Sequence, residues 1–408
     1  MFTRVIQFLK ENFKRSFWVA NIMELFERIA YYGQAAVLSV YLRDYLKFNE
    51  GLAGSLSSIF GGLLYGLPIF AGAIIDKIGF KKSFLFAFLV LGLGYSSLGL
   101  VSNISTSNNL YFIILLILIF TAIGGSFIKP SVLGTVNYTT TEKSKTLGYS
   151  IYYWLVNIGG ALGPILAYLF RNALGIHTVF LVSGISCLLM FFSTMFFYEN
   201  PITYANNNSI KIIIDNFIKV IMNIKFLVFL LIFSLFWIMF WQIFIIIPYY
   251  IRDFIDINAP FDLITSVGPI TIILLQLVIS YFTTKLSAEK AIILGFLLSS
   301  LSWSIVFFSP SLLTIVLMLF FHSIGEQIQA PKYYEYIANI APKGQIGLYQ
   351  GFAFLPIAIG WLFGGTLGGY IYESIKFVSN PKIIFLYVSG IGFLATIFML
   401  IFYKLTKK

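Results

Sequence analysis

Charged side chains recur on one side of a long apolar run near the start of the chain, residues 16–46. At 3.6 residues per turn, a helix through this run gathers its costly polar groups on one face. That face consists of Glu24, Glu27, Arg28, Tyr31 and Tyr32. A charge at bilayer depth costs at least ~2.5–3.5 kcal/mol on insertion scales. We therefore expect the face to be wet and functional.

The chemistry that these residue types support is proton binding linked to the binding of an anionic group. Two carboxylates three residues apart cannot both ionise cheaply in a low dielectric, so one of Glu24 and Glu27 is expected to hold a proton. Its protonation would free Arg28 for a carboxylate of a substrate, which links the two binding events. The expected proton-coupling set is Glu24, Glu27, Arg28 and Lys129.

The composition excludes a water-soluble globule and indicates an integral membrane protein. Of 408 residues, 59% are hydrophobic and only 11% are charged, against roughly 25% charged in soluble domains. The net charge of +11 comes from basic residues scattered through short loops, without the basic stripe of a nucleic-acid-binding protein. The single cysteine, Cys187, excludes an intrachain disulfide. The first apolar run has full spanning length and internal charges, so we expect it to stay as a span rather than serve as a cleaved signal.

Twelve apolar segments of spanning length follow a short amphipathic stretch. Because twelve is even, both termini lie on one side. The termini and the even-numbered connections carry 18 of the 27 basic residues, which predicts that both termini are cytoplasmic in a plasma (inner) membrane. The predicted segments are 17–45, 52–76, 81–101, 110–138, 145–172, 177–198, 225–252, 260–285, 290–308, 312–339, 345–371 and 382–404.

The longest connection divides the chain into two halves. We expect an amphipathic segment at 1–16, a six-helix bundle at 17–199, a cytoplasmic linker with a surface helix at 200–224 and a second six-helix bundle at 225–408. Two parallel repeats of this kind pack around a central cavity in transporters.

A loop motif between the second and third segments supports this layout. Gly72, Asp76, Gly79, Lys81 and Lys82 have the spacing G-x-x-x-D-x-x-G-x-[RK]-[RK], which is similar to a signature of the major facilitator superfamily. An ordinary positive-inside loop is the alternative. The resemblance implies an all-α membrane protein of the major facilitator fold, with twelve transmembrane helices in two six-helix bundles.

Five further motifs resemble those of the proton-coupled oligopeptide transporter (POT) family, in the same order along the chain. They are Glu24-Leu25-Phe26-Glu27-Arg28 with Tyr31-Tyr32-Gly33, Tyr65-Gly66-Leu67-Pro68, Gly124 to Pro130 around Lys129, Tyr152 to Gly159 around Asn157, and Gly325-Glu326 to Pro331. The resemblance implies a symporter that moves short peptides, or similar small zwitterions, with protons by alternating access. It needs no cofactor besides the proton gradient, and no metal.

The resemblance and the residue chemistry together suggest where a zwitterion binds. Its carboxylate would meet Arg28 and Lys129, and its ammonium would meet Glu326, which lies roughly 20 Å inside its span. Alternatively, these charges neutralise one another as buried ion pairs. The expected substrate-binding residues are Arg28, Tyr31, Tyr32, Tyr65, Lys129, Tyr153, Asn157, Gln242 and Glu326; the expected gating residues are Asp76, Pro331 and Gly360.

Departures from the POT pattern leave a second class of substrate as an alternative. Trp241 stands where the family has Glu or Gln, Gly268 where it has Asn, and Ala353 and Trp361 where it favours Trp and Asn. Trp241, Gly268 and Ala353 favour a proton-driven carrier or exporter of another small or amphipathic solute. A membrane enzyme has no motif to support it. The sequence does not exclude a channel or a receptor. Saturable, gradient-dependent flux would distinguish a carrier from both. We expect the carrier to be a monomer.

Overall fold

Helices make up the fold of the part of the chain that the computed structural model describes, namely residues 12–101, 109–141, 144–201, 215, 218–220, 222–283, 285–341, 349 and 351–406. Within these residues, 11 helices are long and apolar enough to cross a membrane. The first predicted span is the 26-residue helix α2 (Arg15–Val40), which its internal charges set apart from those 11. The amphipathic segment expected at 1–16 and the surface helix expected in the linker lie mostly outside the described residues.

The chain forms two compact units, and neither is continuous in sequence. Unit 1 comprises Met1–Gln34 and Leu67–Ile213, and unit 2 comprises Ala35–Gly66 and Ile214–Lys408. The first helix therefore starts in unit 1 and ends in unit 2. The expected division of the chain at 200–224 into two bundles stays a prediction.

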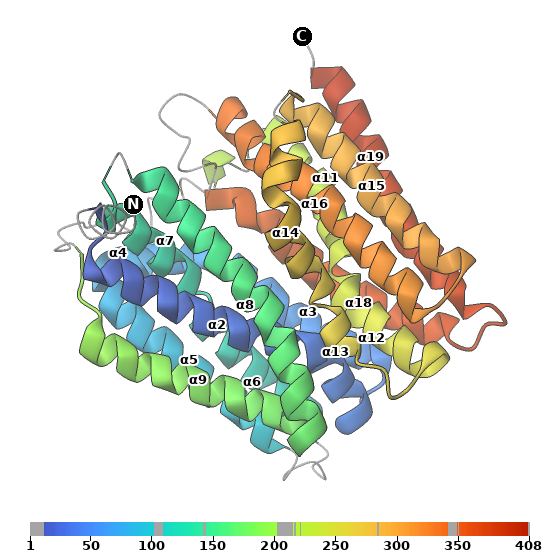
Figure 1. Cartoon of the computed structure of the whole chain (residues 1–408), viewed down its shortest axis with the longest axis horizontal. Helices are drawn as coiled ribbons and strands as arrows, with labels where there is room; N and C mark the ends of the chain where they lie inside the picture. Colours follow the sequence, from blue (N-terminus) through green and yellow to red (C-terminus); the bar gives the residue numbers. More distant parts are fainter. Residues whose placement is uncertain are drawn as a thin grey trace. The chain divides into compact units, whose positions relative to one another are not determined.

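Unit 1 is built around α5, which lies lengthwise against α9 and α6 (Figure 1). Helix α8 contacts α9 and α7. The helices of unit 1 besides the first part of α2 are α4 (Pro68–Ile78), α5 (Phe80–Leu100), α6 (Leu110–Gly125), α7 (Ile128–Thr139), α8 (Lys145–Leu174) and α9 (His177–Phe197).

Unit 2 has two packed groups of helices. Helix α15 packs against α16 and α19, while α18 packs against α3 and α11 (Figure 1). Its helices are η1 (Tyr41–Tyr45), α3 (Glu50–Gly66), α11 (Ile224–Phe240), α12 (Gln242–Tyr250), η3 (Ile251–Ile255), α13 (Phe261–Ile264), α14 (Val267–Thr283), α15 (Ala288–Phe308), α16 (Leu312–Ile340), η4 (Phe352–Phe354), α18 (Leu355–Ile375), η5 (Pro381–Ile383) and α19 (Ile384–Thr406).

Small residues let α3 and α18 approach closely. A Cβ atom on Gly54 would overlap the carbonyl oxygen of Gly365, and a Cβ atom on Gly369 would overlap that of Glu50. Helix association within a bilayer relies on van der Waals packing rather than on a hydrophobic driving force, which favours such small-residue contacts. The pair α3–α18 is therefore held by close backbone packing.

Several spans are interrupted, and predicted site residues lie at the interruptions. Helix α3 ends at Gly66 and α4 begins at Pro68, whose ring cannot donate a helical hydrogen bond. Lys129 is the second residue of α7, just after the break from α6, and Gln242 opens α12. Irregular backbone at membrane depth is tolerated where protein buries it or where it lines a cavity. The breaks thus mark positions at which a pathway can be built.

Candidate functional site

A buried ion cluster on α2 forms the centre of the candidate site in unit 1. Glu24, Glu27 and Arg28 are at most 1% exposed. The Arg28 Nε donates to Glu27 Oε2 at 2.5 Å and lies 3.4 Å from Glu24 Oε1. The helical repeat brings these groups together, as the sequence predicts, because positions 24 and 28 are one turn apart.

The two carboxylates of this cluster are incompletely bonded. Within the described residues, Glu24 Oε2 and Glu27 Oε1 are buried and accept no hydrogen bond. A buried carboxylate oxygen without a donor is costly while the group is ionised. A proton on either carboxylate would lower that cost, which makes the cluster suited to proton binding.

Two other helices of unit 1 contribute to the cluster. The hydroxyl of Tyr152 on α8 donates to Glu24 Oε1 at 3.4 Å, and the Lys129 ammonium of α7 acts electrostatically on Glu24. The four charged groups therefore comprise two acids and two bases. Lys129 is half-buried, whereas Arg28 is enclosed.

The expected aromatic residues of α2 line the same face. The guanidinium of Arg28 lies 4.9 Å from the centroid of the Tyr31 ring, a cation–π contact. The Tyr32 ring is 5.1 Å from that of Tyr31. A Cβ atom on Gly159 of α8 would lie 2.5 Å from Arg28 Cβ. The glycine lets α8 pass directly beside the arginine, which a larger residue would prevent.

The other predicted residues of unit 1 lie at its surface. Tyr153 is 45% exposed, while Asn157 is half-exposed and donates its amide to the Tyr153 carbonyl oxygen at 2.9 Å. Asp76 is exposed near the end of α4, which stops at Gly79 with a φ of 90°. The helix ends there because only glycine adopts this backbone conformation easily.

Unit 2 holds the remaining predicted residues. Glu326 on α16 is half-exposed and makes no hydrogen bond or ion pair with any residue of unit 2 that the structure describes. Pro331, five residues later, lies inside α16, which continues to Ile340. An acid at this depth that has no basic partner among the described residues of unit 2 is available for a cationic group.

Gln242 is committed to helix packing in this structure. Its Nε2 donates to the carbonyl oxygens of Ile238 and Gly364, at 2.8 and 2.9 Å. Gly360 likewise serves packing, because a Cβ atom there would overlap Trp237. Substrate contact by Gln242 and gating by Gly360 stay predictions.

Tyr65 of α3, which the sequence places in the site, lies at the edge of a cluster of aromatic rings. Its ring is 6.0 Å from that of Trp241, which stacks on Trp361 at 4.1 Å between centroids. The indole N–H groups of Trp237, Trp241 and Trp361 are buried without an acceptor among the described residues. Trp241 and Trp361, which both depart from the POT pattern, thus pack against each other.

The sequence reading missed Tyr152 and a charged network in unit 2. The network joins Arg43 and Asp44 of η1 to Arg252 and Asp253 of η3, in reciprocal ion pairs: Arg43 Nη1 is 2.7 Å from Asp253 Oδ2, and Arg252 Nε is 2.6 Å from Asp44 Oδ2. A signal existed, because Tyr41–Leu46 and Tyr250–Ile255 share the pattern Tyr-x-Arg-Asp-aromatic-x. No comparable signal distinguishes Tyr152 from its neighbour Tyr153.

Comparisons of the sequence find transporters. Residues 21–272 and 256–408 match the family model described as Major Facilitator Superfamily. The chain is 29% identical over 185 residues to dipeptide and tripeptide permease B of Aliivibrio fischeri, covering 45% of this chain and 36% of the relative. It is 30% identical over 186 residues to dipeptide and tripeptide permease A of Erwinia pyrifoliae, covering 45% and 37%. The matched part is thus little more than a third of each relative's length.

Solved structures match over nearly the whole chain. A POT family transporter in complex with 5-aminolevulinic acid has a TM-score of 0.80 at 20% identity, and one in complex with a thioalcohol-conjugated peptide has 0.81 at 21%. Both cover 97% of this chain and 97% of the other. The expected fold is confirmed, and the chain is a multi-pass membrane transporter, not an enzyme, that belongs to the Major Facilitator Superfamily.

Proposed function

We propose that the chain is a proton-coupled symporter of short peptides, such as di- and tripeptides, or of similar small zwitterionic solutes. The observation that carries the proposal is the α2 cluster, in which two acids and two bases share a site that α2, α7 and α8 enclose. The relatives described as dipeptide and tripeptide permeases support the same substrate class.

Charge balance explains how protons and substrate would be linked. With Glu24 and Glu27 ionised, Arg28 and Lys129 are neutralised and have no need of a further anion. Protonation of one carboxylate leaves one unit of positive charge uncompensated in a low dielectric, where a substrate carboxylate is strongly favoured. Proton and substrate therefore enter together, and the proton gradient drives uptake. For the substrate's ammonium group we propose Glu326.

Alternating access requires ends of helices that separate. The reciprocal pairs of Arg43 with Asp253 and of Arg252 with Asp44 hold η1 against η3. We assign this network the role of a closure that must break when this end opens. Under the proposed orientation, it faces the outside of the cell.

Uptake into proteoliposomes tests the cargo. An inward proton gradient should concentrate labelled dipeptide inside the vesicles, and unlabelled di- and tripeptides should compete with it. If a broad panel of peptides neither accumulates nor competes, the peptide assignment is wrong.

Cysteine labelling tests the proposed topology in a plasma (inner) membrane with cytoplasmic termini. The only natural cysteine, Cys187, is buried and gives little background. Ser309 and Thr141 are exposed on loops predicted to lie on opposite sides. In intact cells, a membrane-impermeant maleimide should label Ser309→Cys and spare Thr141→Cys. The reverse pattern would invert the topology.

The Trp241–Trp361 stack favours a second candidate, a proton-driven carrier of another small or amphipathic solute. The stack places two apolar rings where POT members have polar groups. Aromatic amphipathic amines should then outcompete dipeptides in the same assay. Equal or weaker competition by these amines would remove this candidate.

A further inference from the structure

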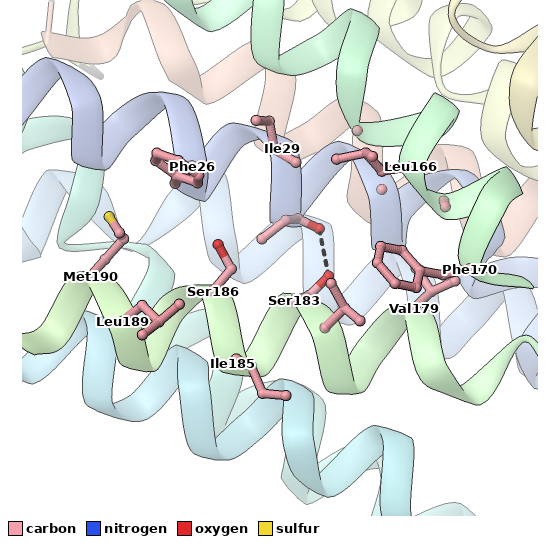
Figure 2. Close-up of a pocket in the computed structure, with 15 residues that line it drawn as sticks. Phe26, Ile29, Leu166, Phe170, Val179, Ser183, Ile185, Ser186, Leu189 and Met190 are labelled. Atoms are coloured by element: carbon pink, nitrogen blue, oxygen red, sulfur yellow. Dashed lines mark hydrogen bonds between the residues drawn. The ribbon is translucent and has the colours of Figure 1, made fainter. Parts of the chain in front are cut away.

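A lateral cavity of about 330 Å³ lies in unit 1 between α2, α8 and α9 (Figure 2). Four residues of α2 line it, namely Phe26, Ile29, Ala30 and Gly33. The opposite walls come from α8 between positions 163 and 170, and from α9 between positions 179 and 190. The cavity is separate from the ion cluster, because its α2 residues lie on the opposite side of that helix.

The lining of this lateral cavity is apolar apart from two serines on α9. Ser183 Oγ donates to the Ala30 carbonyl oxygen at 3.2 Å, as the dashed line in Figure 2 shows. Ser186 Oγ makes no hydrogen bond to any residue that the structure describes. Buried water typically needs about three hydrogen bonds. These walls therefore suit a hydrocarbon occupant and not water.

The cavity opens toward lipid. Phe26, Ile185 and Leu189 stand on its rim and are 42%, 56% and 58% exposed. All three lie well inside helices of spanning length. Such exposed apolar side chains in the middle of a span face the hydrocarbon of the bilayer. Lipid tails can therefore enter the cavity from this side.

The length of the cavity matches one leaflet. Helix α9 has 21 residues and is about 31 Å long, close to the ~30 Å hydrocarbon core. Its lining residues run from Val179 to Met190, which is about 16 Å along the helix. They begin near one end of α9 and stop just past its middle. One acyl chain of one leaflet spans the same depth.

We propose that this lateral cavity is a binding site for a single acyl chain of a bilayer lipid. The acyl chain would press on the face of α2 opposite Glu24, Glu27 and Arg28. Each α2 residue of the cavity is two positions along from a residue of the charged face, which is about 200° around the helix. The acyl chain would fill the space beside the close approach of Gly33 to Gly163, where a Cβ atom on Gly33 would lie 3.1 Å from the Gly163 carbonyl oxygen. The site does not depend on the proposed substrate.

Photolabelling tests the site in the full chain. The protein is reconstituted in phosphatidylcholine vesicles that contain phosphatidylcholine with a diazirine in the middle of one acyl chain. After irradiation, the labelled residues are mapped by mass spectrometry. The label should concentrate on residues 163–170 and 179–190, with severalfold less on Phe192 and Phe196, which are exposed on the same helix but lie outside the cavity. An even distribution along the exposed face of α9 would overturn the proposal.

Cavity-filling variants sharpen the experiment. Ser186→Phe should reduce labelling of these residues severalfold, because the ring occupies the cavity without removing a hydrogen bond to a described residue. Val182→Phe fills the same cavity one turn away and serves if the first variant does not fold. Ser193→Phe is the matched control: the same change, on the same face of α9 and at an equally half-buried position, but outside the cavity. Equal loss in the control, or no loss in either filled variant, would contradict the site.

Discussion

Arg28 and Arg43 lie on the first helix and its continuation, and both are paired with carboxylates, but in different ways. Arg28, in unit 1, pairs with Glu24 and Glu27 of its own helix. Arg43, in unit 2, pairs with its neighbour Asp44 and, at 2.7 and 3.0 Å, with Asp253 from a distant part of the chain. One cluster is local in sequence, and the other joins separate helices.

Solvent exposure separates the two clusters further. The side chains of Glu24, Glu27 and Arg28 are at most 2% exposed, whereas those of Asp44 and Asp253 are 28% and 30% exposed. Partly hydrated pairs can exchange a lost partner for water, so they contribute modestly to stability. The buried group of Glu24, Glu27 and Arg28 cannot lose one charge without leaving another uncompensated. The comparison teaches that the local cluster suits proton chemistry and the distributed network suits a closure that must open.

The largest effect is expected from Arg28→Met. The variant leaves two acids buried without their guanidinium, which costs about 3–5 kcal/mol when a buried pair is broken. SDS titration in mixed micelles should show that loss, and proton-driven uptake should vanish. The triple variant Glu24→Gln, Glu27→Gln, Arg28→Met should regain much of the stability without uptake. If Arg28→Met were as stable as the wild type, the charges of the Arg28 cluster would not depend on one another more strongly than those of the Arg43 network.

Next in size is Glu27→Gln, which keeps the shape of the side chain and removes its proton chemistry. Gradient-driven uptake should fall to background, while exchange of substrate across the membrane continues, because binding no longer depends on a proton at this position. Both are measured in proteoliposomes, with and without a pH gradient. Glu335→Gln, an exposed acid of α16 paired with Lys332, is the control and should behave as wild type. Wild-type coupling in Glu27→Gln would place the proton elsewhere.

A smaller effect is expected in the Arg43 network. A double-mutant cycle of Arg43→Met and Asp253→Asn should give a coupling free energy of about 0.5–3 kcal/mol, as for residues in one ion-pair network. SDS titration measures it. Each single variant should still accumulate substrate with a proton gradient. Complete loss of uptake with unchanged stability would erase the contrast with Arg28.

The smallest effect is expected for Lys376→Met at the edge of the same network. The Lys376 Nζ lies 2.6 Å from Glu50 Oε1, and the Lys376 side chain is 22% exposed. Glu50 is 6% exposed, but it keeps a second basic neighbour, since Arg43 Nη1 lies 3.8 Å from the same oxygen. Partly exposed pairs contribute about 0–1 kcal/mol, and salt screens them over a Debye length of about 3 Å at 1 M. Thermal unfolding of the variant should therefore differ little from wild type at low salt and not at all at high salt. A large salt-independent loss would show that Lys376 has a structural role beyond this pair.

The membrane spans could be predicted from the sequence because hydrocarbon thickness dictates their length. The run 81–101 became α5 and the run 177–198 became α9, each within a residue or two. The interruptions were harder. Pro68 marks the break between α3 and α4, but no proline stands at the break between α11 and α12, where Trp241 stacks on Trp361.

The site was predicted in part. Glu24, Glu27 and Arg28 could be placed together from the helical repeat alone, and the structure brings them together. The choice of Tyr152 rather than Tyr153 as the partner of Glu24 could not be predicted. Adjacent tyrosines point about 100° apart, and only the packing of α8 on α2 selects one of them. Gln242 resembles a pocket residue by motif, yet its amide nitrogen donates to carbonyl oxygens of α11 and α18.

What the sequence by itself determined is every feature that depends on neighbours along one helix: the spans, the charged face of α2 and the balance of acids and bases on it. What only the tertiary structure decided depends on residues far apart in the chain. The pairing of Arg43 with Asp253, the stacking of Trp241 on Trp361 and the lateral cavity behind Phe26 all belong to this class. The physical reason is that helical periodicity is a local property of the backbone, whereas contacts between helices follow from how whole surfaces pack.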